Sequence, residues 1–340
     1  MKALFLGGTG IISSSITELL ISLGWELTLV NRGNHNTLFQ DSVNVIQADC
    51  YDEISMSTHL KDKHYDVVVD FIAYTPEHIE KDIRLFSGKT NQFIFISSAS
   101  AYQKPLASPY ITESTPVSNP YWDYSQKKIE CENKLMDAYR HTGFPITIIR
   151  PSHTYCNHSI PVALHGAQGS YSIINRMRKG KAIIIPGDGT GLWTLTHSKD
   201  FAKGFCGLMG NIHAIGETYQ ITGDESLTWN QIHDCIANAC GVKANFVHIA
   251  SDMIGASCAD FKASLLGDKS NTVIFDNQKL KRAVPDFVAT IRFDQGIRET
   301  IKYFDSHPEL QVEDPAFDAW CDQMILLNDE MKAKLPKFSL

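Results

Sequence analysis

The sequence has no surplus of basic residues, no paired-cysteine motif and no long apolar run. Its 31 Lys and Arg face 38 Asp and Glu, for a net charge of −7, which argues against binding along a nucleic-acid duplex. No stretch approaches the ~20 apolar residues that cross a bilayer, and the run after Met1 stops at Gly7, too short for a secretory signal. The eight cysteines show no Cys-x-x-Cys spacing, which indicates reduced thiols in a cytoplasmic protein.

The composition is that of an ordinary globular protein, with 43% apolar, 10% aromatic and 20% charged residues. A chain of 340 residues is longer than one hydrophobic core comfortably fills, so we expect two structural parts. Neither an internal repeat nor a low-complexity linker separates them, which indicates that the parts interleave along the chain.

Short apolar runs alternate with helical patterns through the first half of the chain. Ala3–Leu6 ends in glycines, and apolar residues between Ile16 and Leu23 then fall on one face of a helix. This alternation predicts an α/β fold, a Rossmann-type doubly wound parallel sheet with helices on both faces. Further strands are expected at Leu27–Val30, Val43–Ile46, Val67–Ile72, Phe93–Ile96 and Ile146–Ile149, with helices at Glu77–Phe86 and Tyr124–His141.

A glycine-rich turn lies between the first strand and the first helix. In this position such a turn indicates a dinucleotide-binding site. Gly7 allows a tight turn, and Gly10 lets backbone N–H groups approach a pyrophosphate at the helix N-terminus. Ser13 stands where the fingerprint has a third glycine, and it is small enough for the helix to lie close to the strand. A purely structural turn is the alternative. The residues expected to contact a dinucleotide are Gly7, Thr9, Gly10, Ile11 and Ile12.

Asn31-Arg32 follow the second strand, where such folds read the adenosine ribose. An acidic residue there binds the 2′-hydroxyl, whereas an arginine accommodates a 2′-phosphate. Because no acid occurs before Asp41, the sequence favours NADP over NAD, with a solvated loop charge as the alternative for Arg32. Asp49, after the third strand, is placed to touch the adenine. Further cofactor contacts are expected at strand ends, from Phe71, Ala73, Pro151 and His153.

The alternation loosens after Arg150-Pro151. We expect residues 1–155 to form the dinucleotide-binding domain, rejoined by about 193–224, and residues 156–192 and 225–340 to form a smaller, interleaved substrate-binding part. After Pro151 the predicted elements are strands at Ile183–Ile185 and Tyr219–Thr222 and a helix at Trp229–Ala239 capped by Thr228. Apolar residues at helical spacing predict a C-terminal helix packed on its own fold: Phe317, Trp320, Met324 and Leu327.

Of the twelve tyrosines, only Tyr124 has a lysine four residues on, at Lys128. On a helix these two side chains share a face, so the ammonium can lie beside the phenol. A phenol is a poor base near neutral pH, and a neighbouring positive charge lowers its pKa towards the working range. By itself this spacing often occurs by chance on a helix surface and does not indicate a catalytic pair.

Ser98 completes the constellation. It follows the predicted strand Phe93–Ile96, and the carboxyl ends of parallel strands are where open α/β sheets bind ligands. Its hydroxyl can hydrogen-bond a substrate oxygen while Tyr124 moves the proton. Ser97 and Ser100 are the alternatives as simple strand-end and turn hydroxyls, and Ser100 is also a candidate substrate contact.

Taken together, these residues resemble the extended short-chain dehydrogenase/reductases, the NAD-dependent epimerase/dehydratase group. The resemblance implies a bound nicotinamide dinucleotide, Tyr124 as acid/base, Lys128 as the residue that holds the ribose and tunes Tyr124, and Ser98 as the residue that orients the substrate. The pieces that match in order are Gly7-Gly8-Thr9-Gly10, Ser97-Ser98 with Tyr102, Tyr124-x-x-x-Lys128, Arg150-Pro151, His197-Ser198-Lys199-Asp200-Phe201-Ala202 and Gly267-Asp268.

Departures from the family pattern bear on the substrate. Ala99-Ser100 stand where dehydratases of the family have Asp-Glu, which disfavours elimination of water. Trp193 and Leu265 stand where nucleotide-sugar epimerases present arginines to a diphosphate, so a free sugar, a sugar lactone or another small hydroxy or keto compound fits better. Replacement charges from Lys262, Lys269 or Arg292 are the alternative.

Two further side chains are weighed as substrate contacts. His153 follows a strand end and would suit a second acid/base, with a hydrogen-bonded structural histidine as the alternative. Trp193 would stack on a sugar ring or lie in the core. His197 is expected to be structural, and His153 with His158 lacks a third ligand, so no metal site is expected.

The sequence therefore predicts an NAD(P)-dependent oxidoreductase or epimerase that acts on a hydroxyl or keto group of a sugar-like molecule. A non-catalytic NAD(P) sensor and an RNA-binding relative are the alternatives, since chloroplast proteins of this fold bind RNA stem-loops. The resemblance also implies a homodimer built from the helix of Tyr124 and the helix Glu77–Phe86. Neither nucleic acid nor a membrane is expected as a partner.

Overall fold

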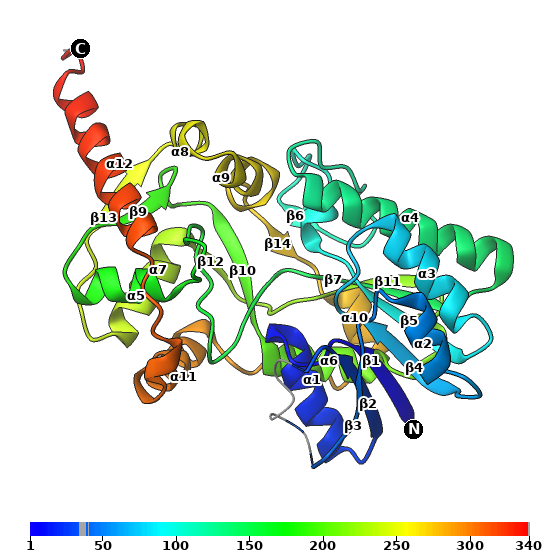
Figure 1. Ribbon diagram of the computed structural model, residues 1–340. Helices are drawn as coiled ribbons and strands as arrows, with labels where there is room; N and C mark the ends of the chain where they lie inside the picture. The colour runs from blue at the N-terminus through cyan, green and yellow to red at the C-terminus, as the bar shows by residue number, and fades with distance from the viewer. Residues whose placement is uncertain (34–38, 40, 339–340) are drawn as a thin grey trace. The chain divides into compact units, whose positions relative to one another are not determined.

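The computed structural model describes residues 1–33, 39 and 41–338 and has a mixed α/β architecture (Figure 1). Its central sheet has seven strands in the order β11-β7-β5-β4-β1-β2-β3, and every neighbouring pair is parallel. The chain runs outwards from β1 in one direction and from β4 in the other, so the predicted doubly wound, Rossmann-type sheet is confirmed. The strands are β1 (Lys2–Leu6), β2 (Glu26–Asn31), β3 (Asn44–Gln47), β4 (Tyr65–Asp70), β5 (Thr90–Ile96), β7 (Ile146–Pro151) and β11 (Glu217–Ile221).

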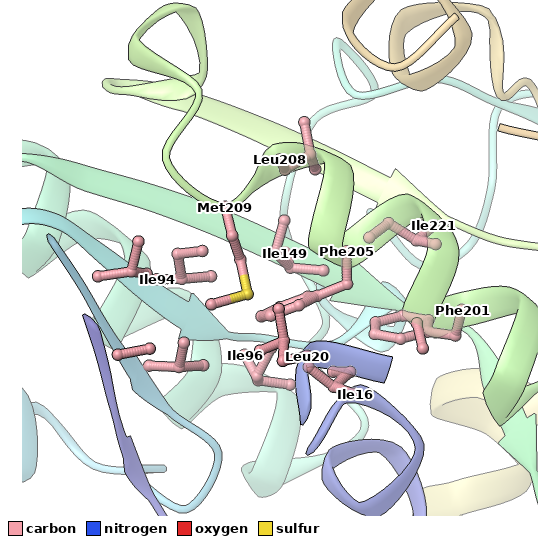
Figure 2. Close-up of a cluster of buried hydrophobic side chains, with 14 of the residues drawn as sticks. Ile16, Leu20, Ile94, Ile96, Ile149, Phe201, Phe205, Leu208, Met209 and Ile221 are labelled. Carbon is pink, nitrogen blue, oxygen red and sulfur yellow. The ribbon is translucent and has the colours of Figure 1, made fainter. Parts of the chain in front are cut away.

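Helices cover both faces of this sheet because successive residues of each strand point to opposite sides. In β1, Ala3 and Phe5 join one apolar cluster, whereas Leu4 and Leu6 join another. The first cluster, drawn in Figure 2, includes α1 and α6, and the second includes α2, α3 and α4. The bounds are α1 (Ile11–Ser22), α2 (Glu53–His59), α3 (Pro76–Phe86), α4 (Asp123–Thr142), α6 (Ser198–Leu208) and α10 (Gln278–Ala283), with the short elements η2 (Ala99–Ala101), β6 (Tyr110–Ile111) and η3 (Ile212–Ala214).

The predicted strands and helices of the first half occur within a few residues of their expected positions. The fourth strand differs, because β4 stops at Asp70 and does not reach Ile72. The Asp70 carboxylate accepts hydrogen bonds from the backbone N–H of Ile72 (2.6 Å) and Ala73 (2.8 Å). These bonds turn the chain out of the sheet, so residues 71–73 form a loop at its carboxyl edge.

The chain divides into two compact units. Unit 1 contains Met1–Thr154, Thr194–Asp224 and Phe275–Thr290, and unit 2 contains Tyr155–Trp193, Glu225–Ile274 and Ile291–Leu340. The sequence alone places residues 275–290 with the second part, whereas the structure places them in unit 1. The reason is local packing, since Leu280 of α10 and Phe287 are buried in the same cluster as α6.

Unit 2 is built mainly of helices around a two-stranded parallel pair of β9 and β13. Thr228 caps α7 in a capping box with Gln231, as predicted for this helix. The bounds are α5 (Tyr171–Arg178), β9 (Ile183–Pro186), β12 (Ser226–Thr228), α7 (Trp229–Ala239), β13 (Phe246–Ile249), α8 (Ser251–Ser257), α9 (Ala259–Ser264), the π-helix η4 (Leu265–Lys269), α11 (Phe293–Ser306), η5 (Pro308–Leu310) and α12 (Pro315–Ala333). Three strands lie at unit boundaries in the chain: β8 (His153–Tyr155), β10 (Leu192–His197) and β14 (Ile274–Phe275).

The C-terminal helix α12 packs along only part of its length. Phe317 and Met324 are buried, and Arg176 of α5 binds Asp318 (2.5 Å) near the start of the helix. Leu327 does not pack as expected, because 57% of its surface is exposed.

Among the described residues, no helix combines the length and apolar character needed to cross a bilayer.

Candidate active site

The glycine turn after β1 adopts a backbone that side chains disfavour. Gly7 and Gly8 have φ angles of +98° and +122°, and a Cβ on Gly8 would lie 2.8 Å from Leu29. Gly10 is the N-cap of α1, and its N–H donates to Ser13 Oγ at 2.8 Å. Ile11 and Ile12 then begin the helix, so their N–H groups belong to the first turn, where amides have no partner within the helix.

A cavity of about 240 Å³ opens beside this turn at the ends of β2 and β3. The buried Asn31 Nδ2 has no hydrogen-bond partner among the described residues, while Asn31 Oδ1 accepts from the Gly33 N–H at 3.0 Å. An unsatisfied buried donor beside an arginine and an open glycine turn fits the ribose and phosphate groups of a dinucleotide. The cavity is lined by Gly7, Thr9, Val30, Asn31, Arg32, Ala48, Asp49, Cys50, Tyr51 and Ile72.

Several lining residues are not in the predicted set. Tyr51 donates from its hydroxyl to the Ile72 carbonyl at 3.3 Å, which joins the end of β3 to the loop after β4. In that loop Ile72 lines the cavity, whereas the predicted contact Phe71 packs inwards against Phe5 and Phe205. Phe71 packs on the same face as Val67 and Val69, whereas Ile72 packs on the face of Val68, so the alternation of β4 continues into the loop.

Lys128 is buried on α4 and is held by two backbone carbonyls. Its Nζ donates to the Ile96 oxygen at the end of β5 and to the Ala73 oxygen, each at 2.7 Å. Burial lowers the pKa of Lys128 to about 8. The same Nζ lies 5.8 Å from the centroid of the Tyr124 ring, so the predicted pair shares one helix face at the sheet edge. Ala73, predicted to contact the cofactor, is buried and contributes a carbonyl that orients Lys128.

Ser98 follows β5 at the same edge and is joined to α4 by hydroxyls. Ser98 Oγ lies 2.9 Å from Ser100 Oγ, which accepts from Ser125 Oγ at 2.7 Å. Ser125 is the residue after Tyr124, and the Tyr124 side chain is 37% exposed. The structure therefore brings Ser98, Tyr124 and Lys128 to one place, with Tyr124 open to solvent and Lys128 beneath it.

The predicted substrate contacts are placed less favourably. Ser100 is only 2% exposed, and its carbonyl accepts from Asn119 at 2.7 Å, so it supports the turn of Ser98. Trp193 is also 2% exposed, packs on Trp229 and donates to the Lys269 carbonyl at 3.1 Å. These contacts place Trp193 in the core of unit 2 rather than on a surface that stacks on a sugar ring.

The remaining predicted residues lie near strand ends. Pro151 is buried at the end of β7, and His153 is half-buried at the start of β8; neither lines the cavity, and their contacts with cofactor or substrate stay predictions. His197 is buried, and its Nδ1 accepts from the Lys199 N–H at 3.2 Å as the cap of α6. Burial lowers the pKa of His197 to about 4, so it stays neutral, as a structural histidine would.

Comparison of the sequence with family models and with known proteins shows which family the chain belongs to. The family model "NAD dependent epimerase/dehydratase family" matches residues 3–222. The chloroplast stem-loop binding protein of 41 kDa b of Arabidopsis thaliana is 26% identical over 260 residues, covering 72% of this chain and 64% of that protein. A UDP-glucose 4-epimerase of Streptococcus mutans is 23% identical over 320 residues, covering 84% and 91%.

Solved structures share the fold. The structure of UDP-glucuronic acid 4-epimerase from Bacillus cereus in complex with UDP-glucuronic acid and NAD has a TM-score of 0.71 at 19% identity and covers 90% of this chain and 99% of its own. The matches of this chain to the first curated relatives span 64%, 51% and 60% of those proteins' lengths. Because the family model covers most of the chain, including the glycine turn, Ser98, Tyr124 and Lys128, the chain belongs to the NAD-dependent epimerase/dehydratase family.

Proposed function

We propose that the chain is an NAD(P)-dependent oxidoreductase or epimerase that acts on a hydroxyl or keto group of a sugar-like small molecule. The observation that carries this proposal is the Lys128 ammonium, fixed by the Ile96 and Ala73 carbonyls beneath the ring of Tyr124. A buried charge beside a partly exposed tyrosine, at the sheet edge where α/β folds bind ligands, is typical of a functional site and not of a lysine that only supports the fold.

The roles of the residues follow from their chemistry. A bound nicotinamide dinucleotide supplies a hydride acceptor at this edge. The Tyr124 phenolate, stabilised by the charge on Lys128, takes the proton of the substrate hydroxyl and becomes a neutral phenol. The Ser98 hydroxyl donates to the substrate oxygen, oriented for this by Ser100.

We propose that NADP is preferred over NAD. Arg32 is exposed and lines the cavity, and Asn31 Nδ2, which has no partner among the residues the structure describes, belongs to the preceding residue. Both groups are donors, and a 2′-phosphate offers acceptor oxygens with negative charge. Asp49 also lines the cavity, on the side formed by β3, where it would reach the adenine.

The substrate is proposed to be sugar-like, without a diphosphate requirement. Leu265 and Trp193 are both core residues of unit 2, so neither position offers a charge to a diphosphate. The turn after β5 carries Ala99 and Ser100 and no carboxylate, so elimination of water by an acid pair at this turn is disfavoured.

The amount of cofactor consumed tests the proposal and separates its two forms. Purified protein is incubated with a panel of sugars and sugar lactones and either catalytic or stoichiometric NADP, and a parallel series uses NAD. Net formation of NADPH indicates a dehydrogenase, whereas conversion of substrate without net reduction indicates an epimerase. Failure of every substrate with both NAD and NADP would contradict the proposal.

RNA binding is a second candidate, favoured by the similarity to a chloroplast stem-loop binding protein. The net charge of −7 opposes it, because RNA binding draws on cationic side chains. A gel shift with an RNA stem-loop at low and high salt checks it. Salt-sensitive binding at micromolar protein, unchanged in Tyr124→Phe, would favour this candidate over the enzyme.

A further inference from the structure

Glu132 and Arg150 form a buried ion pair in unit 1 that the proposed reaction does not use. Their side chains are 4% and 7% exposed. Arg150 Nε and Nη2 donate to the two carboxylate oxygens of Glu132 at 2.9 and 2.5 Å. Burial opposes the charge on Arg150, but the Glu132 carboxylate raises its pKa above the usual range. Buried ion pairs often contribute no more stability than apolar side chains of the same size, so stability alone does not account for this pair.

Glu132 joins the helix of Tyr124 to the turn of Ser98. Tyr124, Lys128 and Glu132 follow one another at four-residue spacing, so they share one face of α4. Lys128 Nζ donates to the Ile96 carbonyl at 2.7 Å, and Ser97 Oγ donates to Glu132 Oε1 at 2.5 Å. Successive turns of α4 therefore bind successive residues at the end of β5, which sets the register between the helix and the strand end.

Arg150 fixes the other side of the same turn. Its guanidinium lies 4.7 Å from the centroid of the Tyr102 ring, and Tyr102 directly follows η2. The Tyr102 hydroxyl donates to Gln220 Oε1 of β11 at 2.9 Å. One ion pair thus contacts residues on both sides of Ser98, Ser97 before it and Tyr102 after it.

We propose that Glu132 is a positioning residue. Through Ser97 and Arg150 it holds the turn of Ser98 in one register against the helix face that presents Tyr124 and Lys128. This inference rests on the proposed function, because it gives Glu132 a role in that same site. Misplacement of a reacting group by ~1 Å can cost about 100-fold in rate, so fixing this register matters for catalysis even where it adds no stability.

Two double variants separate positioning from stability. Glu132→Gln/Arg150→Met and Glu132→Leu/Arg150→Met each remove both charges, so neither leaves a lone buried ion. Only the glutamine keeps an acceptor for Ser97 Oγ. We expect kcat of the leucine variant to be at least about tenfold below that of the glutamine variant, with similar KM, cofactor affinity and urea midpoint. The control is Glu80→Gln, which breaks the exposed Glu80–Lys134 pair and should keep the kcat of the unmodified protein.

Hydrogen exchange of the backbone amides of residues 97–102 gives a readout that needs no substrate. The leucine variant should exchange there at least about tenfold faster than the glutamine variant, while the amides of β4 stay unchanged in both. Equal exchange and equal kcat in the two double variants would overturn the inference, and so would faster exchange with unchanged kcat. If the unmodified protein turns over no substrate, the proposed function fails, and the exchange rates still decide whether Glu132 holds the turn.

Discussion

Lys128 keeps an ammonium group where burial opposes the charge. Two carbonyl oxygens accept from it, and the face of the Phe95 ring lies 4.6 Å from its Nζ. These contacts replace the water that burial removes, and the pKa nonetheless falls to about 8. The residue is therefore a fixed charge beside Tyr124 that can be titrated in an accessible pH range.

The pH dependence of the rate reports on this charge. As the pH rises through about 8, Lys128 loses its proton, and we expect kcat to fall because the phenolate of Tyr124 is no longer stabilised. Unfolding does not explain such a fall, since a lysine with a lowered pKa favours the folded state as pH rises from its folded to its unfolded pKa. In Lys128→Arg the charge persists, so the alkaline limb of the kcat profile should move up, even if the rate is lower. An unmoved limb would contradict this role.

Tyr124 carries the proton in the proposed reaction. Tyr124→Phe should lower kcat by at least about 100-fold, because general acid–base catalysis contributes 10²–10⁴-fold. Dinucleotide affinity and the urea midpoint should stay close to those of the unmodified protein, since the side chain is partly exposed. Tyr121→Phe, at an exposed tyrosine nearby in the chain, is the matched control. Full activity in Tyr124→Phe would contradict the enzyme and favour a non-catalytic sensor.

At the scale of elements, the turn between β1 and α1 requires glycine at position 8 both for its backbone angle and for space, whereas Gly24 beyond α1 requires only the backbone angle. Gly8 has a φ of +122° and lies against Leu29 of β2. Gly24, after α1, has a φ of +73° with no atom within 4 Å of an added Cβ. The two positions therefore separate backbone strain from crowding.

The alanine variants of these glycines should differ in stability. Gly24→Ala adds only backbone strain and should lower the free energy of unfolding by about 1–2 kcal/mol. Gly8→Ala adds a close contact with Leu29 to that strain, so its cost should be larger, about 3 kcal/mol or more. Urea denaturation measures both values. Equal costs would show that the turn relaxes away from β2.

At the scale of the whole molecule, a bound dinucleotide should stabilise the fold, because its proposed contacts would come from the ends of β1, β2 and β3 and the start of α1 together. A ligand at 100 times its dissociation constant adds about 2.7 kcal/mol to the free energy of unfolding. At equal concentration we expect a larger rise in Tm with NADPH than with NADH. Arg32→Ala should remove the difference, and an equal or larger rise with NADH would contradict the preference.

The homodimer implied by family resemblance stays a prediction. Its expected surface, α3 and α4, carries exposed ion pairs such as Lys134–Glu80 and Lys127–Asp123. Such pairs remain solvated in a monomer and are compatible with a polar interface rim. Light scattering should give about twice the chain mass of 38.0 kDa, and a value near 38.0 kDa would contradict the dimer.

The sequence predicts a structural feature well where that feature depends on a single strand, helix or turn. The alternation of apolar runs and helical patterns predicted the parallel sheet, and Thr228 marked the start of α7. The spacing of Tyr124 and Lys128 alone put both side chains on one helix face. These features depend on residues close together in the chain, so backbone periodicity is sufficient to predict them.

Contacts between distant residues are decided only by the tertiary structure. The sequence could not show that residues 275–290 return to unit 1 or that Leu327 lies exposed. The link from Glu132 through Ser97 and Arg150 to the turn of Ser98 joins three elements, α4, β5 and β7. Each of these outcomes depends on which surfaces meet once the strands are ordered, and the period of a single strand or helix carries no information about its neighbours.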